Sequence, residues 1–551
     1  MEKLGRKEMP AGYAAGDFKY MGRPAKDQGD FGSDVGIADM ACVNQFGEAN
    51  NSKGYHIGVV QSKDGKWFVY AEWGRIKPGK SWNGGFTGAV QDFQFYRCDS
   101  ESDARSAFRM QAESKNVKRL IQKSFGGATV WTSKEGDDGY IVQSLATREK
   151  GLPDACLIKD DTGVTKRAPT PAKAASAAPA KPMASFQAQV VQLAQALVGG
   201  TKTYTKALSA ATGIVPTMGA ITQVRDQLIP AALQRIQTVG SSISDLVRDR
   251  DLQAISKMVY SMVPREIPRS GLSPEQAILS GGNILALQAD LDAFESSLGN
   301  EDFSTEAPST SVDPHALLKA QVRWLDPNQD PVGKWLTETL PKMITSRNAY
   351  SGSLRVLNLF EVTRPDRDTK FMEEVKRVAA LRKGKFSLRA NLQPKTRPDV
   401  VGAEGDLYGQ ANVIFTQHGT RSVNVHPIVS THFRMPRSLS GVPIAGANFG
   451  HGNYQATSCL KAYGYTSGGN SYWTAGGGGI QGRGGFMFLC DSVMGDAYRA
   501  PSTGSWTTPP DGKDSVFGVG GDRGHSLAND EHVFFKEHLV RIRYLAEVKV
   551  A

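Results

Sequence analysis

The stretch ANVIFTQHGTRSVN, residues 411–424, places an apolar run directly before His418, Gly419 and Thr420. Such a run predicts a buried strand, and the glycine after it predicts a turn. The three residues at the junction are compatible with an ordinary turn or with the floor of a dinucleotide pocket. The second interpretation requires the other parts of such a pocket elsewhere in the chain.

The last part of the 551-residue chain repeats the strand pattern. LRVLNLFEV (354–362), GFMFLCDSV (485–493) and EHVFFKEHLVRIRYLAEVKV (531–550) are strand-like, and they outnumber the helix-like segments. We therefore expect residues 306–551 to form an α+β domain with an antiparallel core.

The first part of the chain divides into a tail and a β-rich domain. Residues 1–35 are polar and Gly-rich, which predicts a flexible tail, and a β-rich domain is expected over 36–155. GYHIGVVQ (54–61) and KWFVYAEWGRI (66–76) flank a Lys-Asp-Gly turn and predict a hairpin. DFQFYRC (92–98) predicts another strand, and residues 100–125 predict one or two helices capped by Ser100 or Ser102.

The middle of the chain predicts a linker and a helical bundle. Residues 156–183 contain TKRAPTPAKAASAAPAKPM, which lacks aromatic residues and is typical of a semi-extended linker. Over 184–305, apolar residues recur at helical spacing, which predicts a helical bundle. Because a β-rich domain precedes this bundle and an α+β domain follows it, we expect the whole chain to be a multidomain α+β protein. The two clearest helical faces contain Phe186, Val190, Leu193 and Leu197, and Ile284, Leu287, Leu291 and Phe294.

Composition restricts the class of protein. A formal net charge of +10 favours polyanionic partners such as nucleic acid, or it serves only solubility. Five scattered cysteines without a C-x-x-C pair argue against a disulfide framework and against structural zinc. We see no signal peptide and no apolar run of 18 residues, so we expect a soluble intracellular protein without a membrane partner.

Two motifs have a simple structural alternative. Gly477, Gly479 and Gly482 satisfy G-x-G-x-x-G, but a strand follows them instead of a helix, so we do not expect a Rossmann site. In the second motif, tryptophans flank basic residues, a pattern suited to nucleic-acid ends. A core tryptophan beside a solvated basic turn is the simpler alternative for its members Trp73, Arg75, Lys77, Lys80 and Trp82.

The chain from residue 418 onward carries the remaining parts of a possible pocket. Two tyrosine rings could sandwich a flat cationic ring, and a histidine could hydrogen-bond a ribose hydroxyl. A glutamate could then stabilise the positive charge that develops when the glycosidic bond to that ring breaks.

Four stretches in this region resemble the catalytic domain of the DNA-dependent poly(ADP-ribose) polymerases. HGTRSVN is similar to the family's His-Gly-Ser-Arg-x-x-Asn segment. The other three catalytic stretches are FGHGNYQATSCLKAYGY (449–465), PPDGKDSVFGVGG (509–521) and NDEHVFFKEHLVRIRYLAEVKV (529–550).

Other parts of the chain also resemble this family. WFVYAEWGRI looks like its Trp-Gly-Arg (WGR) domain, the bundle resembles its regulatory helical domain, and RNAY (347–350) matches a short catalytic segment. As no zinc fingers precede the WGR-like domain, the layout resembles the shorter members of the family.

The resemblance implies a triad of His418, Tyr454 and Glu531. His418 would hold the adenosine ribose of NAD+, and the main chain of Gly419 would bind the nicotinamide carboxamide. Tyr454 and Tyr465 would sandwich the nicotinamide ring. Glu531 would bond the nicotinamide ribose, stabilise the oxocarbenium-like transition state and polarise the acceptor hydroxyl. Thr420, Asn424 and Arg434 match positions on the adenosine side, and Lys461 matches an active-site lysine.

This sequence departs from the family pattern at Ala462, where the family has a serine that bonds the carboxamide. One lost hydrogen bond corresponds to about 0.5–1.5 kcal/mol of binding free energy. Asn453 replaces an isoleucine before Tyr454, and the Gly-rich segment 468–485 has no counterpart.

The resemblance therefore predicts an NAD-dependent ADP-ribosyltransferase activated by DNA strand breaks, with NAD+ as substrate and no metal. Glu531 favours polymer formation on acceptor proteins, including the enzyme itself, and an accessory factor could complete the acceptor site. The alternatives are a mono-ADP-ribosyltransferase acting on protein or DNA ends and a catalytically weak DNA-end scaffold. We expect a nuclear location in a eukaryote, and the cytoplasm or nucleoid for a bacterial or viral protein.

Overall fold

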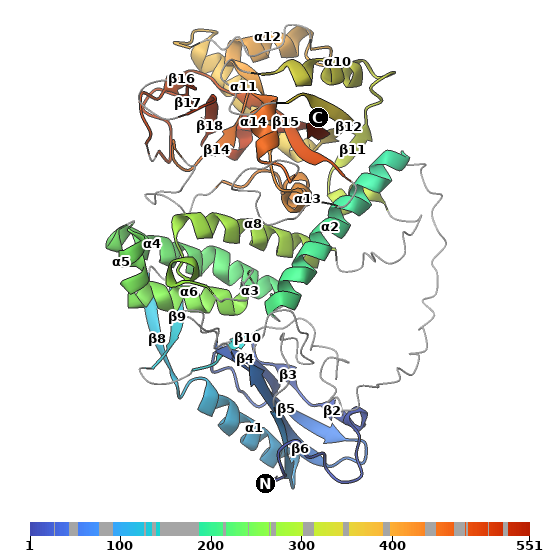
Figure 1. Cartoon of the computed structure of the whole chain (residues 1–551), viewed down its shortest axis with the longest axis vertical. Helices are drawn as coiled ribbons and strands as arrows, with labels where there is room; N and C mark the ends of the chain where they lie inside the picture. Colours follow the sequence, from blue (N-terminus) through green and yellow to red (C-terminus); the bar gives the residue numbers. More distant parts are fainter. Residues whose placement is uncertain are drawn as a thin grey trace. The chain divides into compact units, whose positions relative to one another are not determined.

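The computed structural model describes most of the chain outside the expected linker (Figure 1). It divides into two compact units, one of residues 1–181 and 205–298 and one of residues 182–204 and 299–551. The described residues are 1–26, 28–42, 53–75, 92–125, 128–134, 139–143, 187–212, 216–240, 242–263, 265, 272–300, 313–344, 352–388, 397–435, 448–467, 480, 483–504, 506–521 and 527–550.

Within its described residues, the first unit contains an eight-stranded sheet. Its strands follow the order β1-β7-β6-β5-β4-β10, while β2 pairs with β5 and β3 with β4. The predicted hairpin is confirmed, since β5 and β6 pair antiparallel over nine residue pairs. The strand bounds are β1 Glu2–Lys3, β2 Phe18–Tyr20, β3 Arg23–Pro24, β4 Val35–Cys42, β5 Lys53–Ser62, β6 Trp67–Arg75, β7 Asp92–Cys98 and β10 Ile141–Gln143.

The expectation of a flexible tail over residues 1–35 is wrong. The segment supplies three strands of the sheet, and Phe18, Tyr20 and Phe31 are buried. The polar, Gly-rich composition was misleading because a few aromatic residues at the right positions bury enough apolar surface to fix the backbone.

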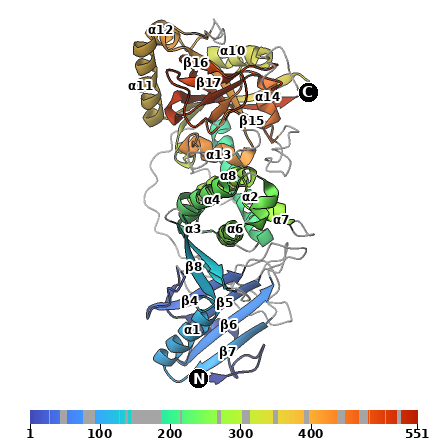
Figure 2. The ribbon, with the colours of Figure 1, turned by 90° about the vertical axis from the view of Figure 1, so that its left-hand side faces the viewer.

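Helix α1 (Glu101–Lys115) packs its apolar residues onto one face of this sheet (Figure 2). Ser100 caps it, as predicted, by accepting a hydrogen bond from the Asp103 amide at 3.1 Å. The prediction of further helix up to residue 125 is wrong. Residues Leu120–Phe125 form strand β8, which pairs with β9 (Ala128–Ser133) as a separate hairpin.

The other elements described in the first unit are helices, and the last part of α2 belongs with them. The two predicted apolar faces are confirmed where the structure describes them, because Val190, Leu193, Leu197, Ile284 and Leu291 are all at most 1% exposed. The first four turns of α2 belong to the second unit, although the sequence predicted one bundle over 184–305. The bounds are α2 Ala188–Thr212, α3 Met218–Gln223, η4 Val224–Leu228, α4 Ile229–Val239, α5 Ile243–Arg248, α6 Arg250–Met262, α7 Pro274–Ala277 and α8 Gly281–Leu298.

The second unit confirms the predicted antiparallel core. A five-stranded sheet has the order β11-β12-β19-β15-β13, with every neighbouring pair antiparallel. A smaller sheet has the order β14-β18-β17-β16. The bounds are β11 Gln321–Trp324, β12 Leu354–Thr363, β13 Val413–Gly419, β14 Asn453–Gln455, β15 Gly485–Val493, β16 Ala497–Arg499, β17 Ser515–Gly518, β18 Glu531–Phe534 and β19 Val540–Val550.

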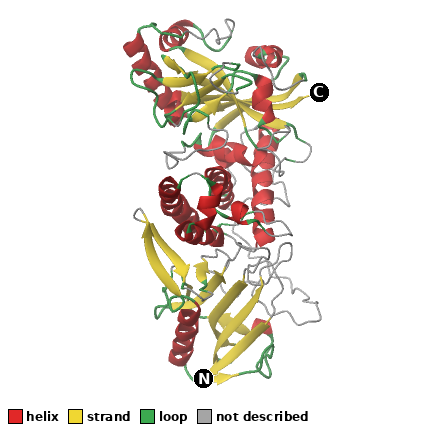
Figure 3. Cartoon of the chain, turned by 60° about the vertical axis from the view of Figure 1, so that its left-hand side comes forward, coloured by secondary structure: helices red, strands yellow, loops and turns green. Residues whose placement is uncertain are grey.

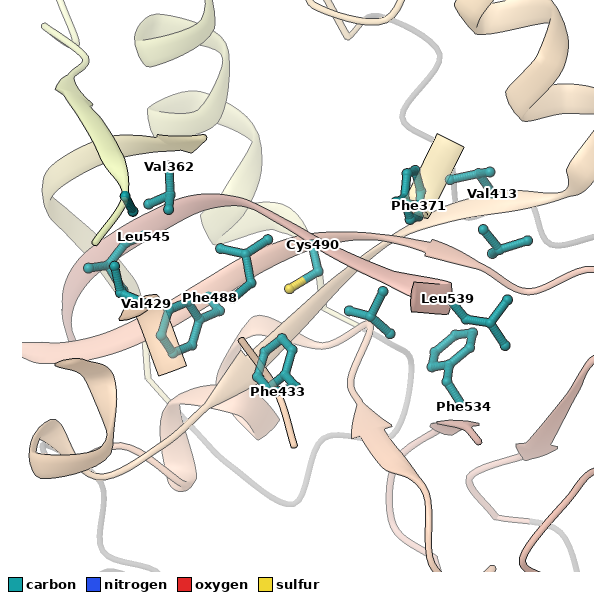
Figure 4. Packing of buried hydrophobic residues seen from close by; sticks show 14 of the residues in the cluster. Val362, Phe371, Val413, Val429, Phe433, Phe488, Cys490, Phe534, Leu539 and Leu545 are labelled. Carbon is teal, nitrogen blue, oxygen red and sulfur yellow. The ribbon is translucent and has the colours of Figure 1, made fainter. Parts of the chain in front are cut away.

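Helices cover the larger sheet of this unit on both sides (Figure 3). One core joins strand residues to α11 (Pro365–Arg382), α12 (Gly402–Ala411), α13 (Ser422–Thr431) and the start of α2 (Figure 4). A second core joins the opposite face to α10 (Pro331–Thr339), η5 (Leu340–Lys342) and α14 (Cys459–Gly464). This rigid packing fixes the ends of β13, β14 and β18, where the predicted site residues lie. The remaining helices are α9 Pro314–Leu318 and η8 Glu537–Leu539.

No helix in the described ranges is long and apolar enough to cross a membrane.

Candidate active site

His418 lies near the end of β13, the strand that the apolar run before it forms. Its Nδ1 lies 2.9 Å from the carbonyl oxygen of Tyr454. Because a carbonyl only accepts hydrogen bonds, Nδ1 carries the proton and Nε2 is left as an acceptor. Burial lowers the pKa of His418, while the Tyr454 carbonyl opposes this shift. The ring is therefore neutral at pH 7 and can accept a hydrogen bond from a hydroxyl group.

Tyr454, on β14, is fixed at its hydroxyl group by the turn that precedes it. The hydroxyl donates to the Gly450 carbonyl at 2.8 Å and accepts from the Phe449 amide at 2.9 Å. Gly450 has φ +86°, and a Cβ there would lie 1.9 Å from the Trp506 carbonyl oxygen, so this turn requires glycine. Burial raises the pKa of Tyr454, the Phe449 amide opposes this, and the charge of Glu531 raises it further.

Glu531, the first residue of β18, is paired at only one of its two oxygens. Oε1 accepts a hydrogen bond from Lys461 Nζ at 2.8 Å, and the same ammonium donates to the Asp530 carbonyl at 3.1 Å. Oε2 is buried and has no hydrogen-bond partner among the described residues. Burial lowers the pKa of Lys461, and Glu531 partly opposes that shift. A buried carboxylate oxygen with free lone pairs is costly unless a ligand uses it.

The strand pairings explain why the three predicted triad residues converge. β13 contacts β14 through a bridge in which Gln417 and Ala456 exchange backbone hydrogen bonds of 2.7 and 2.8 Å. β14 pairs with β18 so that Tyr454 lies opposite Val533. Residues directly opposite share a face, and so do alternate residues of one strand. Tyr454 and Glu531 therefore lie on the same face, next to the end of β13 that carries His418.

Gly419 packs against helix α14 so closely that no side chain fits. A Cβ at this position would lie 1.6 Å from the carbonyl oxygen of Ala462 and 3.3 Å from its Cα. Residue 462 is thus next to Gly419, as the resemblance to a carboxamide site implies. Tyr465 follows α14 directly, and its amide donates to the Ala462 carbonyl at 3.1 Å.

The residues predicted for the adenosine side lie at or just beyond the two ends of α13. Thr420 Oγ1 accepts a hydrogen bond from Asn424 Nδ2 at 3.1 Å, and Asn424 Oδ1 is buried without a partner among the described residues. At the other end, the Phe433 ring lies 4.8 Å from the His418 ring. The next residue, Arg434, is exposed.

Arg434 is one of the residues that line a hollow of about 500 Å³, which we call the arginine hollow. Arg364 and Arg367 were not predicted from the sequence. The signal for them was TRPDR (363–367), where two arginines surround the proline that opens α11. The lining residues are Arg364, Arg367, Ser430, Thr431, Arg434, Met435 and Glu537.

Of the residues predicted to bind DNA, the structure describes the Trp73 side chain. It packs on the core of the first unit, and its ring stacks on Tyr55 with centroids 6.2 Å apart. The Arg6 guanidinium lies 5.9 Å from the Trp73 ring, and Lys115 Nζ lies 5.4 Å from the Tyr55 ring. For Arg75 only the backbone, at the end of β6, is described. The described residues do not include Lys77, Lys80, Trp82, RNAY or the three glycines of the G-x-G-x-x-G motif.

In the ranges given above, no group of three His, Cys, Asp or Glu side chains could hold a metal ion.

Comparison with known families identifies the catalytic region. Residues 339–524 match the family model of the poly(ADP-ribose) polymerase catalytic domain, which covers about a third of the chain. The match contains His418 and Tyr454 and ends before Glu531, so the position of the glutamate beside Tyr454 rests on the pairing of β18 with β14. No curated protein matches the chain. The matched domain indicates an NAD+ ADP-ribosyltransferase.

Proposed function

We propose that this NAD+ ADP-ribosyltransferase builds poly(ADP-ribose) on protein side chains and is activated by DNA breaks. The observation that carries the catalytic part of the proposal is the buried, unpaired Oε2 of Glu531 beside Tyr454. A preorganised negative charge stabilises a cationic transition state strongly because it needs no reorganisation during the reaction.

In the proposed reaction, the bond between nicotinamide and the C1′ atom of its ribose breaks, and nicotinamide leaves with the bonding electron pair. The ribose becomes positively charged, and Glu531 stabilises it through Oε2. An acceptor hydroxyl or carboxylate oxygen then attacks C1′, and a hydroxyl proton passes to Glu531 or to solvent.

His418 and Lys461 would position the two sides of this site. The neutral His418 ring would accept a hydrogen bond from an adenosine ribose hydroxyl at Nε2, since Nδ1 is held by the Tyr454 carbonyl. Lys461 would hold Glu531 Oε1 and so direct Oε2 to the substrate. Because the ammonium is bonded to both Glu531 and a backbone carbonyl, it restricts the carboxylate to one orientation.

DNA activation would begin at the first unit. Two stacked aromatic rings, Trp73 and Tyr55, lie between two cations, Arg6 next to Trp73 and Lys115 next to Tyr55. Such an arrangement supports base or sugar stacking next to phosphate contacts, with Arg75, Lys77 and Lys80 as further cations. Burial lowers the pKa of Lys115, and the nearby Arg119 and Lys53 lower it further, which indicates concentrated positive charge.

Regulation would follow from the helical region after the linker. By resemblance, this region blocks the NAD site in the free protein, and DNA binding destabilises it. Such a switch requires that DNA bind the open state more tightly than the closed one.

Single transfer is the alternative that a specific observation favours. Ala462 lies beside Gly419 and offers no hydroxyl group to the nicotinamide carboxamide, so NAD+ would bind more weakly. Weaker binding of each new NAD+ molecule would shorten the product.

Incubation of the whole protein with labelled NAD+, with and without nicked or blunt DNA, tests these proposals. A DNA-stimulated ladder that Glu531→Gln abolishes supports the polymerase. A single discrete product identifies a mono-ADP-ribosyltransferase, and no incorporation under any DNA condition contradicts the catalytic role of the triad and leaves a DNA-end scaffold.

A further inference from the structure

The strands that carry His418 and Tyr454 belong to two different sheets. β13 is an edge strand of the five-stranded sheet, and β14 is an edge strand of the smaller sheet. Within the described residues, their backbones pair at a single isolated bridge, between Gln417 and Ala456. In a longer ladder, successive residue pairs fix the direction of both strands. A single bridge fixes one point of contact, so other contacts must set the angle between these two strands.

Four buried polar side chains form hydrogen bonds across the gap between the two sheets, and we call them the inter-sheet network. Thr416 Oγ1 donates to Gln455 Oε1 at 3.1 Å, and Gln455 Nε2 donates to Asn453 Oδ1 at 2.8 Å. Ser492, on the neighbouring strand β15, has its Oγ 2.8 Å from Thr416 Oγ1. Thr416 gives its one hydroxyl hydrogen to an amide oxygen, which can only accept, so Ser492 donates to Thr416. All three hydrogen bonds therefore run in one direction, from β15 through β13 to β14.

The inter-sheet network is enclosed in the second unit. Thr416 and Ser492 are 0% exposed, Gln455 is 2% exposed and Asn453 is 7% exposed. The ordinary explanation is that buried polar groups satisfy one another. An apolar layer would need no such partners, and Ile414, two positions before Thr416, is part of the apolar core. Hydrogen bonds differ from apolar contacts in being directional, so the network fixes a distance and an angle that apolar packing would leave less defined.

The network is built from the immediate neighbours of two triad residues. Thr416 lies two positions before His418, on the same face of β13, while Asn453 and Gln455 lie on either side of Tyr454. Asn453 is also the position at which the family has an isoleucine. His418 Nδ1 donates to the Tyr454 carbonyl at 2.9 Å. The side-chain contacts of Thr416 and His418 thus lie on the two sides of the backbone bridge.

We propose that Thr416 and Gln455 are positioning residues that set the angle between β13 and β14, and through it the spacing of His418 and Tyr454. The inference rests on the proposed function, in which His418 and Tyr454 bind opposite ends of NAD+. Thr416 and Gln455 act through the strands that carry those residues. A ligand that spans both strands needs the correct spacing, whereas a ligand that contacts only the β13 side does not.

The test compares these two kinds of ligand. Calorimetry measures the affinities of NAD+ and AMP for the whole protein carrying Glu531→Gln, so that NAD+ is not consumed. AMP matches the adenosine side of NAD+, for which His418 and residues around α13 are proposed. Thr416→Val removes the hydroxyl and keeps the shape. It should weaken NAD+ binding about tenfold, because the aligned geometry then lacks one hydrogen bond. The affinity for AMP should be unchanged.

Two further threonine substitutions serve as controls. Thr416→Ser keeps the hydroxyl donor and should restore NAD+ binding to within about twofold of the Glu531→Gln parent. Thr457→Val removes another buried threonine hydroxyl, one that makes no hydrogen bond among the described residues. This variant should leave both affinities unchanged, and chemical denaturation of each variant reports stability separately.

A double substitution tests whether Thr416 and Gln455 act through their shared hydrogen bond. Gln455→Met keeps the length of the side chain and should weaken NAD+ binding by a similar factor. With Thr416→Val added, the loss should remain about tenfold instead of reaching about a hundredfold, because both substitutions remove the same contact.

Three results would overturn the proposal. Equal NAD+ affinities in Thr416→Val and Thr457→Val would show that the Thr416 hydroxyl does not align the strands. An equal loss of NAD+ and AMP binding would show a general effect on the fold of the site. A hundredfold loss in the double variant would show that the two residues act independently. Because these readouts measure binding, a wild type without turnover would refute the proposed function and leave the comparison of the variants intact.

Discussion

Glu531 and Asp491 are both buried acids of the second unit, yet their surroundings differ. Asp491, on β15, is fully buried, and both oxygens are paired: Oδ1 with Arg397, and Oδ2 with the Tyr408 hydroxyl at 2.9 Å and Arg541 at 3.0 Å. Glu531 has one cation and one unpaired oxygen. Burial alone therefore does not identify a functional carboxylate. A buried carboxylate oxygen that lacks a hydrogen-bond partner is the feature that distinguishes Glu531 from Asp491.

The largest effect expected from this difference is on stability. Asp491→Asn should lower the free energy of unfolding by about 3–5 kcal/mol, because it removes the central buried anion of the network and leaves Arg397 paired only with Asp399 and Arg541 only with Glu404. Chemical denaturation measures the loss. A change below about 1 kcal/mol would show that the network is not the structural element we describe.

Glu531→Gln should affect catalysis more than stability. We expect the rate of transfer to fall about a thousandfold, since the variant removes the charge that faces the developing cation. The free energy of unfolding should fall by less than in Asp491→Asn, because only one buried cation, Lys461, loses its counterion and the amide oxygen can still accept its hydrogen bond. Nicotinamide release and denaturation, measured on the same preparation, check both statements. Full activity in this variant would remove the basis for assigning Oε2 to catalysis.

The two acids should also respond differently to pH. Burial raises the pKa of Asp491, but Arg397, Arg541 and Arg543 outweigh it and hold the pKa below its usual value. A lowered pKa in the folded state contributes stability that is present above the unfolded pKa of about 3.9 and lost as the pH falls towards the folded pKa. Between pH 5 and 3, the wild type should lose more stability than Asp491→Asn. Parallel curves would contradict this.

The pKa of His418 predicts a smaller effect, on activity. Because burial lowers this pKa, the ring should stay neutral below the usual histidine value of about 6.5. We expect kcat/KM to remain level as the pH falls from 8 to about 6.5, while unfolding is monitored separately. A fall centred near pH 6.5 that His418→Asn removes would show that the ring has an ordinary pKa.

Ala462→Ser should give the smallest effect. A serine hydroxyl beside Gly419 can donate to the nicotinamide carboxamide, and one hydrogen bond corresponds to at most about tenfold in affinity. KM for NAD+ should fall, with kcat nearly unchanged, and Ala462→Val serves as the control for added volume. An unchanged KM in the serine variant would indicate that residue 462 does not face the carboxamide.

The sequence predicts structural features formed by neighbouring residues better than features formed by residues far apart in the chain. The strand before His418 and the helix after Ser100 are local patterns, and both were predicted. The role of residues 1–35 depends on pairing with strands up to 95 positions away, so local composition misled. The arginine hollow joins side chains from α11 and α13, and no short stretch of sequence contains that arrangement.

The candidate site shows the same contrast. His418, Gly419 and Tyr454 lie within recognisable segments, whereas the pairing of Lys461 with Glu531 bridges 70 positions along the chain. Trp73 illustrates a signal that the sequence left open, because an aromatic residue in a basic segment suits a core as well as a nucleic acid. Its stacking on Tyr55 shows the packing role directly.

Helix α2 has a practical consequence for expressing the catalytic part alone. Val190, Leu193 and Leu197 lie in the same core as Phe371 and Val375 of α11, although more than 100 residues separate them from the expected domain start at 306. A fragment that begins there would present an uncovered apolar strip to solvent and would be prone to aggregate. A soluble fragment needs the segment 187–204 supplied in the same polypeptide or as a separate peptide.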